Sequence, residues 1–142
     1  MKRDRILLIA TVACVIGAAV WGFSLAGSPE TRRRERLDEL RLQHLRAIVR
    51  EIQRQVNDDN DMAALERPLP TDLETVAERA LDERLVLVDP ETGIPYGYTV
   101  KSATTYEICA TFVLPRDEDR QVFWNHPAAA HCFTVDVLDP PG

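Results

Sequence analysis

The longest apolar run in the chain lies close to its first residue. From Ile6 to Gly27 no residue is charged, and about 22 residues at 1.5 Å each span a hydrocarbon core of roughly 30 Å. Trp21 lies towards one end of the run, where an indole ring suits the headgroup level. The pattern predicts a membrane anchor over residues 1–27, with Ile6, Trp21 and Leu25 among its residues.

A cleaved signal peptide is the alternative for this segment. Lys2 to Arg5 form a basic segment before the apolar run, and Ser24-Leu25-Ala26 offers the small-x-small spacing of a cleavage site. The run exceeds the roughly 7–15 apolar residues of most signal peptides. We therefore expect the segment to be retained as an anchor.

A second helix is predicted directly after the anchor, with Ser28 as its N-cap and Pro29 at its first position. Apolar residues then recur at helical spacing, which marks one buried face: Leu37, Leu40, Leu45, Ile48, Val49, Ile52 and Val56. We expect an amphipathic stalk helix over residues 28–58. Its charged residues, Asp38 and Arg41 among them, are expected on a solvated or membrane-proximal face, and His44 at the surface or in packing.

Residues 59–142 are predicted to form a small α+β domain. The acidic stretch from Asn57 to Asp61 indicates a solvated linker. Further on, Thr71-Asp72-Leu73-Glu74 has the Thr-x-x-Glu form of a capping box, with Thr71 as the N-cap of a short second helix.

Three strands are expected after a turn at Asp89–Gly93, where proline presets φ and glycine supplies a positive φ. Their apolar residues alternate with polar ones: Ile94, Tyr96, Tyr98 and Val100; Tyr106, Ile108, Ala110 and Phe112; Phe133, Val135 and Val137. The predicted fold class is therefore α+β, with an N-terminal transmembrane helix, an amphipathic helix, a short second helix and a small antiparallel β-sheet.

Cys109 and Cys132 fall on the more polar faces of the second and third strands. If these strands are neighbours, a disulfide would close a loop of about 24 residues, which stabilises a fold by roughly 3 kcal/mol. A zinc site at His126, His131 and Cys132 is the alternative. It lacks a clear fourth ligand, and adjacent strand residues point to opposite faces, so we predict the disulfide and no metal or other cofactor.

The loop from Leu114 to His131 is the predicted recognition surface, with Phe123, Trp124 and His126 as possible interface residues. Aromatic side chains after a charged stretch can anchor an interface. Trp124 can equally fold back to cover the sheet, and the sequence leaves both open.

Charge and motifs narrow the function classes. The net charge of -6 argues against nucleic-acid binding, which needs clustered cations to neutralise phosphates. The chain has no Gly-x-Ser-x-Gly, no phosphate-binding glycine loop and no His-Glu-x-x-His. We therefore expect a protein that is not an enzyme.

Four segments carry a resemblance to known families. They are Leu69-Pro70-Thr71-Asp72-Leu73, the turn segment Asp89-Pro90-Glu91-Thr92-Gly93-Ile94-Pro95-Tyr96-Gly97-Tyr98, the strand Tyr106–Phe112 and the segment Trp124–Phe133. Together they resemble uncharacterised bacterial single-span membrane proteins, and the order of elements is similar to the pseudopilins of type II secretion, notably their G-like member. The resemblance implies a pilin-like C-terminal domain on an anchor.

The expected function is a non-catalytic, membrane-anchored accessory subunit whose partners are the lipid bilayer and proteins of a larger inner-membrane assembly. One alternative is a minor pseudopilin-like component of a secretion or pilus system, and a second is a metal- or thiol-dependent site at His126, His131 and Cys132. We expect a single-pass protein of the bacterial inner membrane with its C-terminal domain in the periplasm, because long domains translocate largely regardless of charge and paired cysteines indicate an oxidising compartment.

Overall fold

The computed structural model describes residues 2–26, 28–58, 61–65, 67–81, 85–120 and 122–141. The side chains of residues 2–4, 23–26, 58 and 61–65 lie outside this description, and Leu25 of the predicted anchor is among them. The chain forms two compact units, Met1–Arg34 and Glu35–Gly142.

Helix α1 (Lys2–Ala26) makes up most of the first unit. Its stretch from Arg5 to Gly22 is long and apolar enough to cross a membrane, a property that signal sequences share. Every side chain in this stretch is exposed, including Ile6 and Trp21. The predicted apolar helix is therefore present, and its described apolar side chains are exposed.

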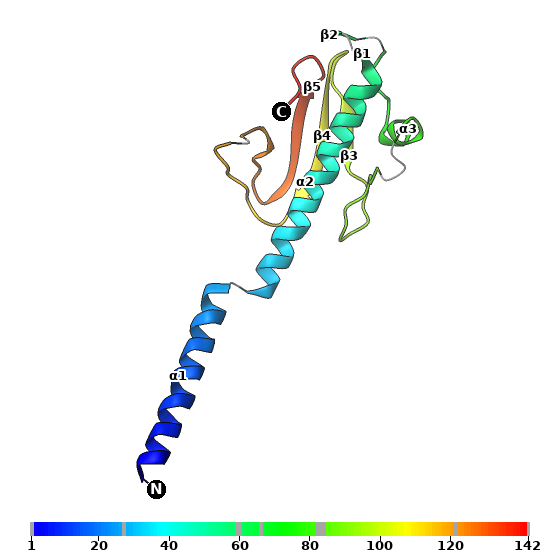
Figure 1. Cartoon of the computed structure of the whole chain (residues 1–142). Helices are drawn as coiled ribbons and strands as arrows, with labels where there is room; N and C mark the ends of the chain where they lie inside the picture. Colours follow the sequence, from blue (N-terminus) through cyan, green and yellow to red (C-terminus); the bar gives the residue numbers. More distant parts are fainter. Residues whose placement is uncertain are drawn as a thin grey trace. The chain divides into compact units, whose positions relative to one another are not determined.

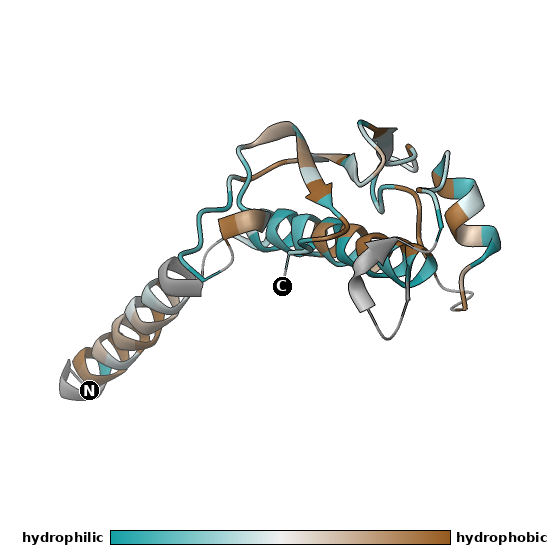
Figure 2. Cartoon of the chain, turned by 90° about the horizontal axis from the view of Figure 1, so that it is seen from above, coloured by the Kyte–Doolittle hydropathy of each residue, from teal (hydrophilic) through white to brown (hydrophobic). Residues whose placement is uncertain are grey.

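Helix α2 (Pro29–Val56) begins where the sequence predicts, because the Ser28 hydroxyl accepts a hydrogen bond from the Thr31 backbone N–H at 3.1 Å. Hydrophobic and hydrophilic residues alternate along its turns (Figure 2). The buried apolar residues are Leu42, Leu45, Ile48, Val49, Ile52 and Val56. From Glu35 onwards the helix belongs to the same compact unit as the sheet, so most of the predicted stalk is a core element.

A short hairpin follows α2 where the sequence indicated a linker. Strand β1 (Asn57–Asp58) pairs antiparallel with β2 (Asp61–Leu65), while Asp59 and Asn60 lie outside the described residues. The linker prediction is thus wrong for the described part of this stretch. Turn-forming residues suit a hairpin as well as a linker, and composition alone did not separate the two.

Helix α3 (Leu73–Glu78) forms as predicted, but its cap is displaced by one residue. Asp72, not Thr71, is the N-cap, and its carboxylate accepts a hydrogen bond from the Thr75 N–H at 2.7 Å. The Thr71 hydroxyl instead donates to the Asp72 carboxylate at 2.9 Å. A charged carboxylate is the stronger acceptor and also interacts favourably with the positive end of the helix.

The second unit is built on a three-stranded antiparallel sheet of order β3-β4-β5, formed by β3 (Gly97–Val100), β4 (Thr105–Phe112) and β5 (Ala129–Asp136). Helix α2 lies across one face of this sheet (Figure 1). The sheet residues of the shared core are Tyr106, Ile108, Ala110, Phe112, Phe133 and Val135. The predicted α+β class with a small antiparallel sheet is confirmed.

Strand β3 starts later than the alternation from Ile94 predicts. The Tyr96 N–H donates to the Leu87 carbonyl at 2.9 Å, and Pro95 bridges to Val88. Residues 94–96 are therefore drawn away from β4 towards residues 87–88. Ile94 is 65% exposed as a result.

Candidate interaction site

A buried ion network joins α2 to the turn at residues 89–93. The Arg41 guanidinium donates to Asp38 at 2.7 Å, to Asp89 at 2.5 and 3.2 Å, and to Glu91 at 3.1 Å. Arg41 is 2% exposed and Asp38 6%. The expectation that both residues lie on a solvated helix face is therefore wrong, because ion pairing lets these charges enter the core.

Asp38 also connects α2 to the end of β4. Its carboxylate accepts hydrogen bonds from the backbone N–H of Val113 at 3.0 and 3.1 Å and from that of Leu114 at 2.8 Å. These two amides follow the last β4 residue. One carboxylate thus balances Arg41 and also satisfies the backbone where the strand ends.

Asp89 organises the turn from within. Its carboxylate accepts from the backbone N–H of Glu91 and Thr92, each at 2.9 Å, and its carbonyl accepts from Gly93. Gly93 adopts the predicted positive φ, at 70°. Burial raises the pKa of Asp89, but hydrogen bonds from Arg41, Thr92 and Glu91 lower that pKa by more, so the carboxyl stays ionised.

His44 and Tyr96 extend the contact between α2 and this turn. The His44 Nδ1 lies 2.9 Å from the Tyr96 hydroxyl. Burial lowers the pKa of His44 and raises the pKa of Tyr96. Both groups are therefore neutral near pH 7, which agrees with the predicted packing role of His44.

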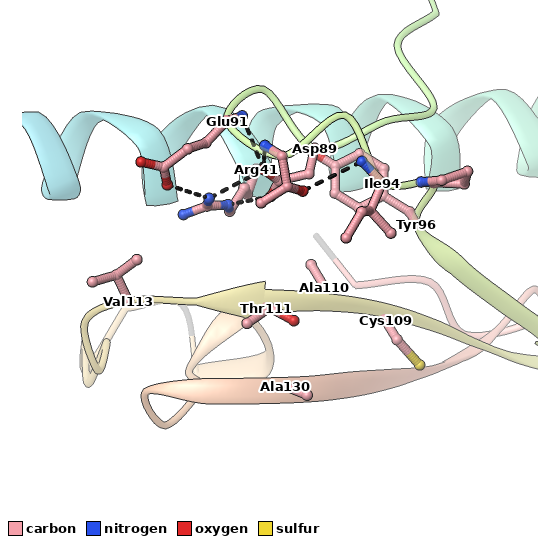
Figure 3. Close-up of a pocket in the computed structure, with 12 residues that line it drawn as sticks. Arg41, Asp89, Glu91, Ile94, Tyr96, Cys109, Ala110, Thr111, Val113 and Ala130 are labelled. Atoms are coloured by element: carbon pink, nitrogen blue, oxygen red, sulfur yellow. Dashed lines mark hydrogen bonds and ion pairs between the residues drawn. The ribbon is translucent and has the colours of Figure 1, made fainter.

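Two cavities flank the ion network. The first, of about 380 Å³, lies between the turn and β4 and is mainly apolar; Arg41 and Glu91 stand at one side of it, with Ile94, Ala110 and Thr111 also in its lining (Figure 3). The second, of about 460 Å³, is acidic. Its charged lining residues are Glu35, Asp38, Glu39, Asp117 and Glu118, together with Arg116.

The structure contains the predicted disulfide. Cys109 and Cys132 are register partners on β4 and β5, and their sulfurs are bonded. Gly97 is the β3 partner of Cys109. A Cβ at Gly97 would lie 3.0 Å from the Cys109 Cβ, so only glycine fits beside the disulfide without displacement.

The predicted recognition loop is mostly packed against the sheet. Trp124 is 3% exposed; its ring centroid lies 5.0 Å from that of Phe133, and the Arg46 guanidinium lies over it. His126 is buried and stacks on Phe112. Of the three possible interface residues, only Phe123, at 37% exposure, presents much surface; Trp124 folds back over the sheet, one of the two arrangements left open.

Each residue of the alternative metal site has another contact in the structure. The sulfur of Cys132 is bonded to Cys109, so it has no thiolate to offer a metal ion. His126 lies against Phe112, and burial lowers its pKa. His131 packs edge-on to Phe133. In the part of the chain that the structure describes, no three His, Cys, Asp or Glu side chains form a group able to hold a metal ion.

Sequence reasoning missed the ion network although α2 contains a signal for it. Asp38 and Arg41 precede Leu45 by seven and four residues, so both continue the buried stripe towards the start of the helix. Charged residues at stripe positions require partners inside the fold. The partner, Asp89, lies 48 residues away in the sequence, so helical periodicity in α2 does not reveal it.

Comparison of the chain with protein-family models, with characterised proteins and with solved structures finds no match.

Proposed function

We propose that this protein is a non-catalytic, membrane-anchored interaction subunit whose small domain binds a partner protein. The carrying observation is an apolar helix with exposed side chains from Arg5 to Gly22 in the same chain as a folded, disulfide-closed unit. Exposed apolar helices of this length are stable in lipid, where their side chains need no protein partner. The helix supplies attachment, and the unit from Glu35 onwards supplies recognition.

The proposed location is the bacterial inner membrane, with the folded unit in the periplasm. The Cys109–Cys132 disulfide supports this side, because such bonds persist in oxidising compartments and are rare in the cytosol. Alkaline phosphatase fused after residue 142 should be active, whereas a fluorescent protein that folds only in the cytoplasm should stay dark. The reverse pattern would contradict the orientation.

Co-purification tests the function itself. A C-terminally tagged full-length chain is extracted from its native membrane in mild detergent, and proteins recovered in stoichiometric amount are identified by mass spectrometry. We expect a stable larger complex. An isolated monomer at every detergent-to-protein ratio would contradict an accessory role.

A minor pseudopilin-like component is the second candidate. The amphipathic α2 packed on a small antiparallel sheet supports it. This function requires the membrane helices of several copies to pack together. Cys14 is exposed on α1 and provides a natural probe. Mild oxidation in the membrane should then join two chains through Cys14, and Cys14→Ser should abolish the product. If the natural chains stay unlinked, the pseudopilin-like candidate is contradicted and the accessory subunit is favoured.

A further inference from the structure

Strand β4 has an edge that β3 covers only in part. β3 pairs with β4 from Val100↔Tyr106 to Gly97↔Cys109 and stops there, whereas β5 pairs with β4 as far as Phe112. The β3 side of β4 beyond Cys109 therefore has no strand partner within the described residues. Uncovered edges present backbone groups to which another strand can pair.

The backbone groups of Thr111 point to that uncovered side. The Cα atoms of Cys109 and Cys132 lie 4.0 Å apart, which marks a pair without mutual hydrogen bonds. Cys109 and, two residues on, Thr111 therefore direct their N–H and C=O away from β5. Two other residues at alternate positions of the same stretch also bond to groups outside β5. The Thr105 carbonyl accepts from the Lys101 N–H, and the Val113 N–H donates to Asp38.

The sequence explains why β3 leaves this position open. Continuing the register by two residues from Gly97 places Pro95 opposite Thr111. Proline has no N–H to donate to the Thr111 carbonyl. Its neighbour Tyr96 is hydrogen-bonded to Leu87, so the chain turns away from β4 at this point.

The cavity of about 380 Å³ occupies the opening that results. Ala110, Thr111 and Val113 line it from β4 and its end, and Ile94 and Tyr96 face them from the segment that follows the turn (Figure 3). Ile94 is 65% exposed and Val113 38%, so the mouth is apolar and open to solvent. The edge from Ala110 to Val113 matches roughly three residues of extended chain at about 3.4 Å each.

Charge selects the occupant further. Figure 3 shows Glu91 above the Val113 end of the cavity and Tyr96 towards the Cys109 end. Three carboxylates, those of Asp38, Asp89 and Glu91, form ion pairs with the Arg41 guanidinium. The Glu91 side chain is 38% exposed. A basic side chain is the complement to this end.

We propose that the edge cavity binds a short extended segment of a partner protein, which pairs with Thr111 through its backbone, places an apolar side chain against Ile94 and Ala110, and carries a Lys or Arg at the Glu91 end. Main-chain hydrogen bonds supply affinity in this mode of recognition, and side-chain pockets supply specificity. The inference deepens the proposed function, on which it rests, by naming the surface and the chemistry of the partner.

The direct test uses the full-length chain in lipid nanodiscs, with a capped pentapeptide of alternating valine and threonine that ends in lysine. Hydrogen exchange of the Thr111 amide, followed by NMR, should slow by roughly tenfold or more on saturation. The same peptide with N-methyl groups on alternate amides should bind at least about tenfold more weakly, because it loses its main-chain donors. An unchanged Thr111 exchange rate at saturation, or equal binding of the N-methyl peptide, would overturn the proposal.

Matched variants separate backbone pairing from side-chain effects. Thr111→Pro removes the N–H that faces the open edge, and Thr111→Val keeps it; only the proline variant should lose peptide binding. Glu91→Lys should weaken binding of the peptide that ends in lysine and strengthen binding of one that ends in glutamate. Glu91→Gln should have an intermediate effect on both affinities. Equal binding by all four variants would contradict the proposal, while the N-methyl comparison on the natural chain stays decisive if Thr111→Pro does not fold.

Failure of this inference differs from failure of the proposed function. If a partner co-purifies equally with Thr111→Pro and Thr111→Val, the protein is an interaction subunit but the edge cavity is not its contact. If no partner co-purifies with the natural chain, the proposed function itself fails. The natural chain and Thr111→Val could instead form particles of twice the chain mass while Thr111→Pro stays monomeric. That result would identify the occupant as a second copy and would overturn the choice of a different partner protein.

Discussion

Arg41 shows how one side chain fixes the geometry of the folded unit. It is buried and meets carboxylates from α2 and from the turn at residues 89–93. The hydrogen bonds that Arg41 donates to these acids, to Asp89 foremost, raise the pKa of Arg41, so the guanidinium is permanently charged. The position of the turn over β4, and with it the wall of the edge cavity, depends on this residue.

Arg41→Met should therefore be strongly destabilising. It leaves Asp38 and Asp89 buried without their cation, and removal of one partner from a buried ion pair costs roughly 3–5 kcal/mol. Urea unfolding at pH 7 measures the loss. Arg50→Met, at an exposed position on the same helix, should change the free energy of unfolding by less than about 0.5 kcal/mol; similar losses in both variants would contradict the network's role.

Asp89 predicts an acid-sensitive fold. Its pKa in the folded state lies below the ordinary value of 3.8, so its stabilising contribution is complete above about pH 4 and is lost as the pH falls further. Asp89→Asn should lower the free energy of unfolding by about 2 kcal/mol at pH 7 and show a shallower loss below pH 4. Asp119→Asn, at an exposed position, is the control. If the free energy of unfolding of Asp89→Asn fell below pH 4 as steeply as that of the natural chain, Asp89 would not be the source of the acid sensitivity.

At the scale of elements, pairing between β4 and β5 carries the sheet. Register partners run from Thr105↔Asp136 to Phe112↔Ala129, and the disulfide joins the strands at Cys109 and Cys132. β3 is shorter because Pro95 and Tyr96 are drawn to residues 87–88. The open sheet edge and the cavity beside it thus both follow from the departure of β3 from β4.

Removing the disulfide should weaken this pairing without erasing the fold. Replacing both Cys109 and Cys132 with serine opens a loop of the size for which chain entropy gives roughly 3 kcal/mol. The free energy of unfolding should fall by about that amount and become insensitive to reductant. Cys14→Ser, which lies on α1 outside the folded unit, should leave it unchanged; reductant sensitivity in the double variant would contradict the bond.

At the scale of the whole molecule, α2 is the element on which the folded unit is assembled. Its residues from Leu42 to Val56 share one core with the sheet and α3. The boundary between compact units falls at Arg34 and Glu35, inside the helix and well before the predicted domain start at residue 59. We therefore expect the segment predicted to be a stalk to be required for folding.

Two fragments test this division. Residues 35–142 should give a cooperative thermal transition and a dispersed NMR spectrum, because they retain the whole core. Residues 59–142 should not fold, because they lack the apolar face of α2 and expose the sheet residues that it covers. A folded 59–142 fragment would show that α2 is dispensable.

The sequence by itself determined the elements whose signals are local. The apolar run of α1, the stripe of α2 and the alternation in β4 and β5 each follow from hydrophobic periodicity, and the turn at Gly93 follows from its conformational freedom. The facing of Cys109 and Cys132 followed once their strands were taken as neighbours. Apart from the cysteine pair, these features depend on residues close in the chain.

Tertiary structure alone decided where the charges and the loop residues lie. Arg41 is buried because Asp89, 48 residues away, faces it, and Trp124 is covered because Arg46 and Phe133 enclose it. The first residue of β3 was decided by competition between β4 and residues 87–88 for the segment that precedes Gly97. Burial of a polar group depends on partners brought together by folding, and local periodicity carries no information about them.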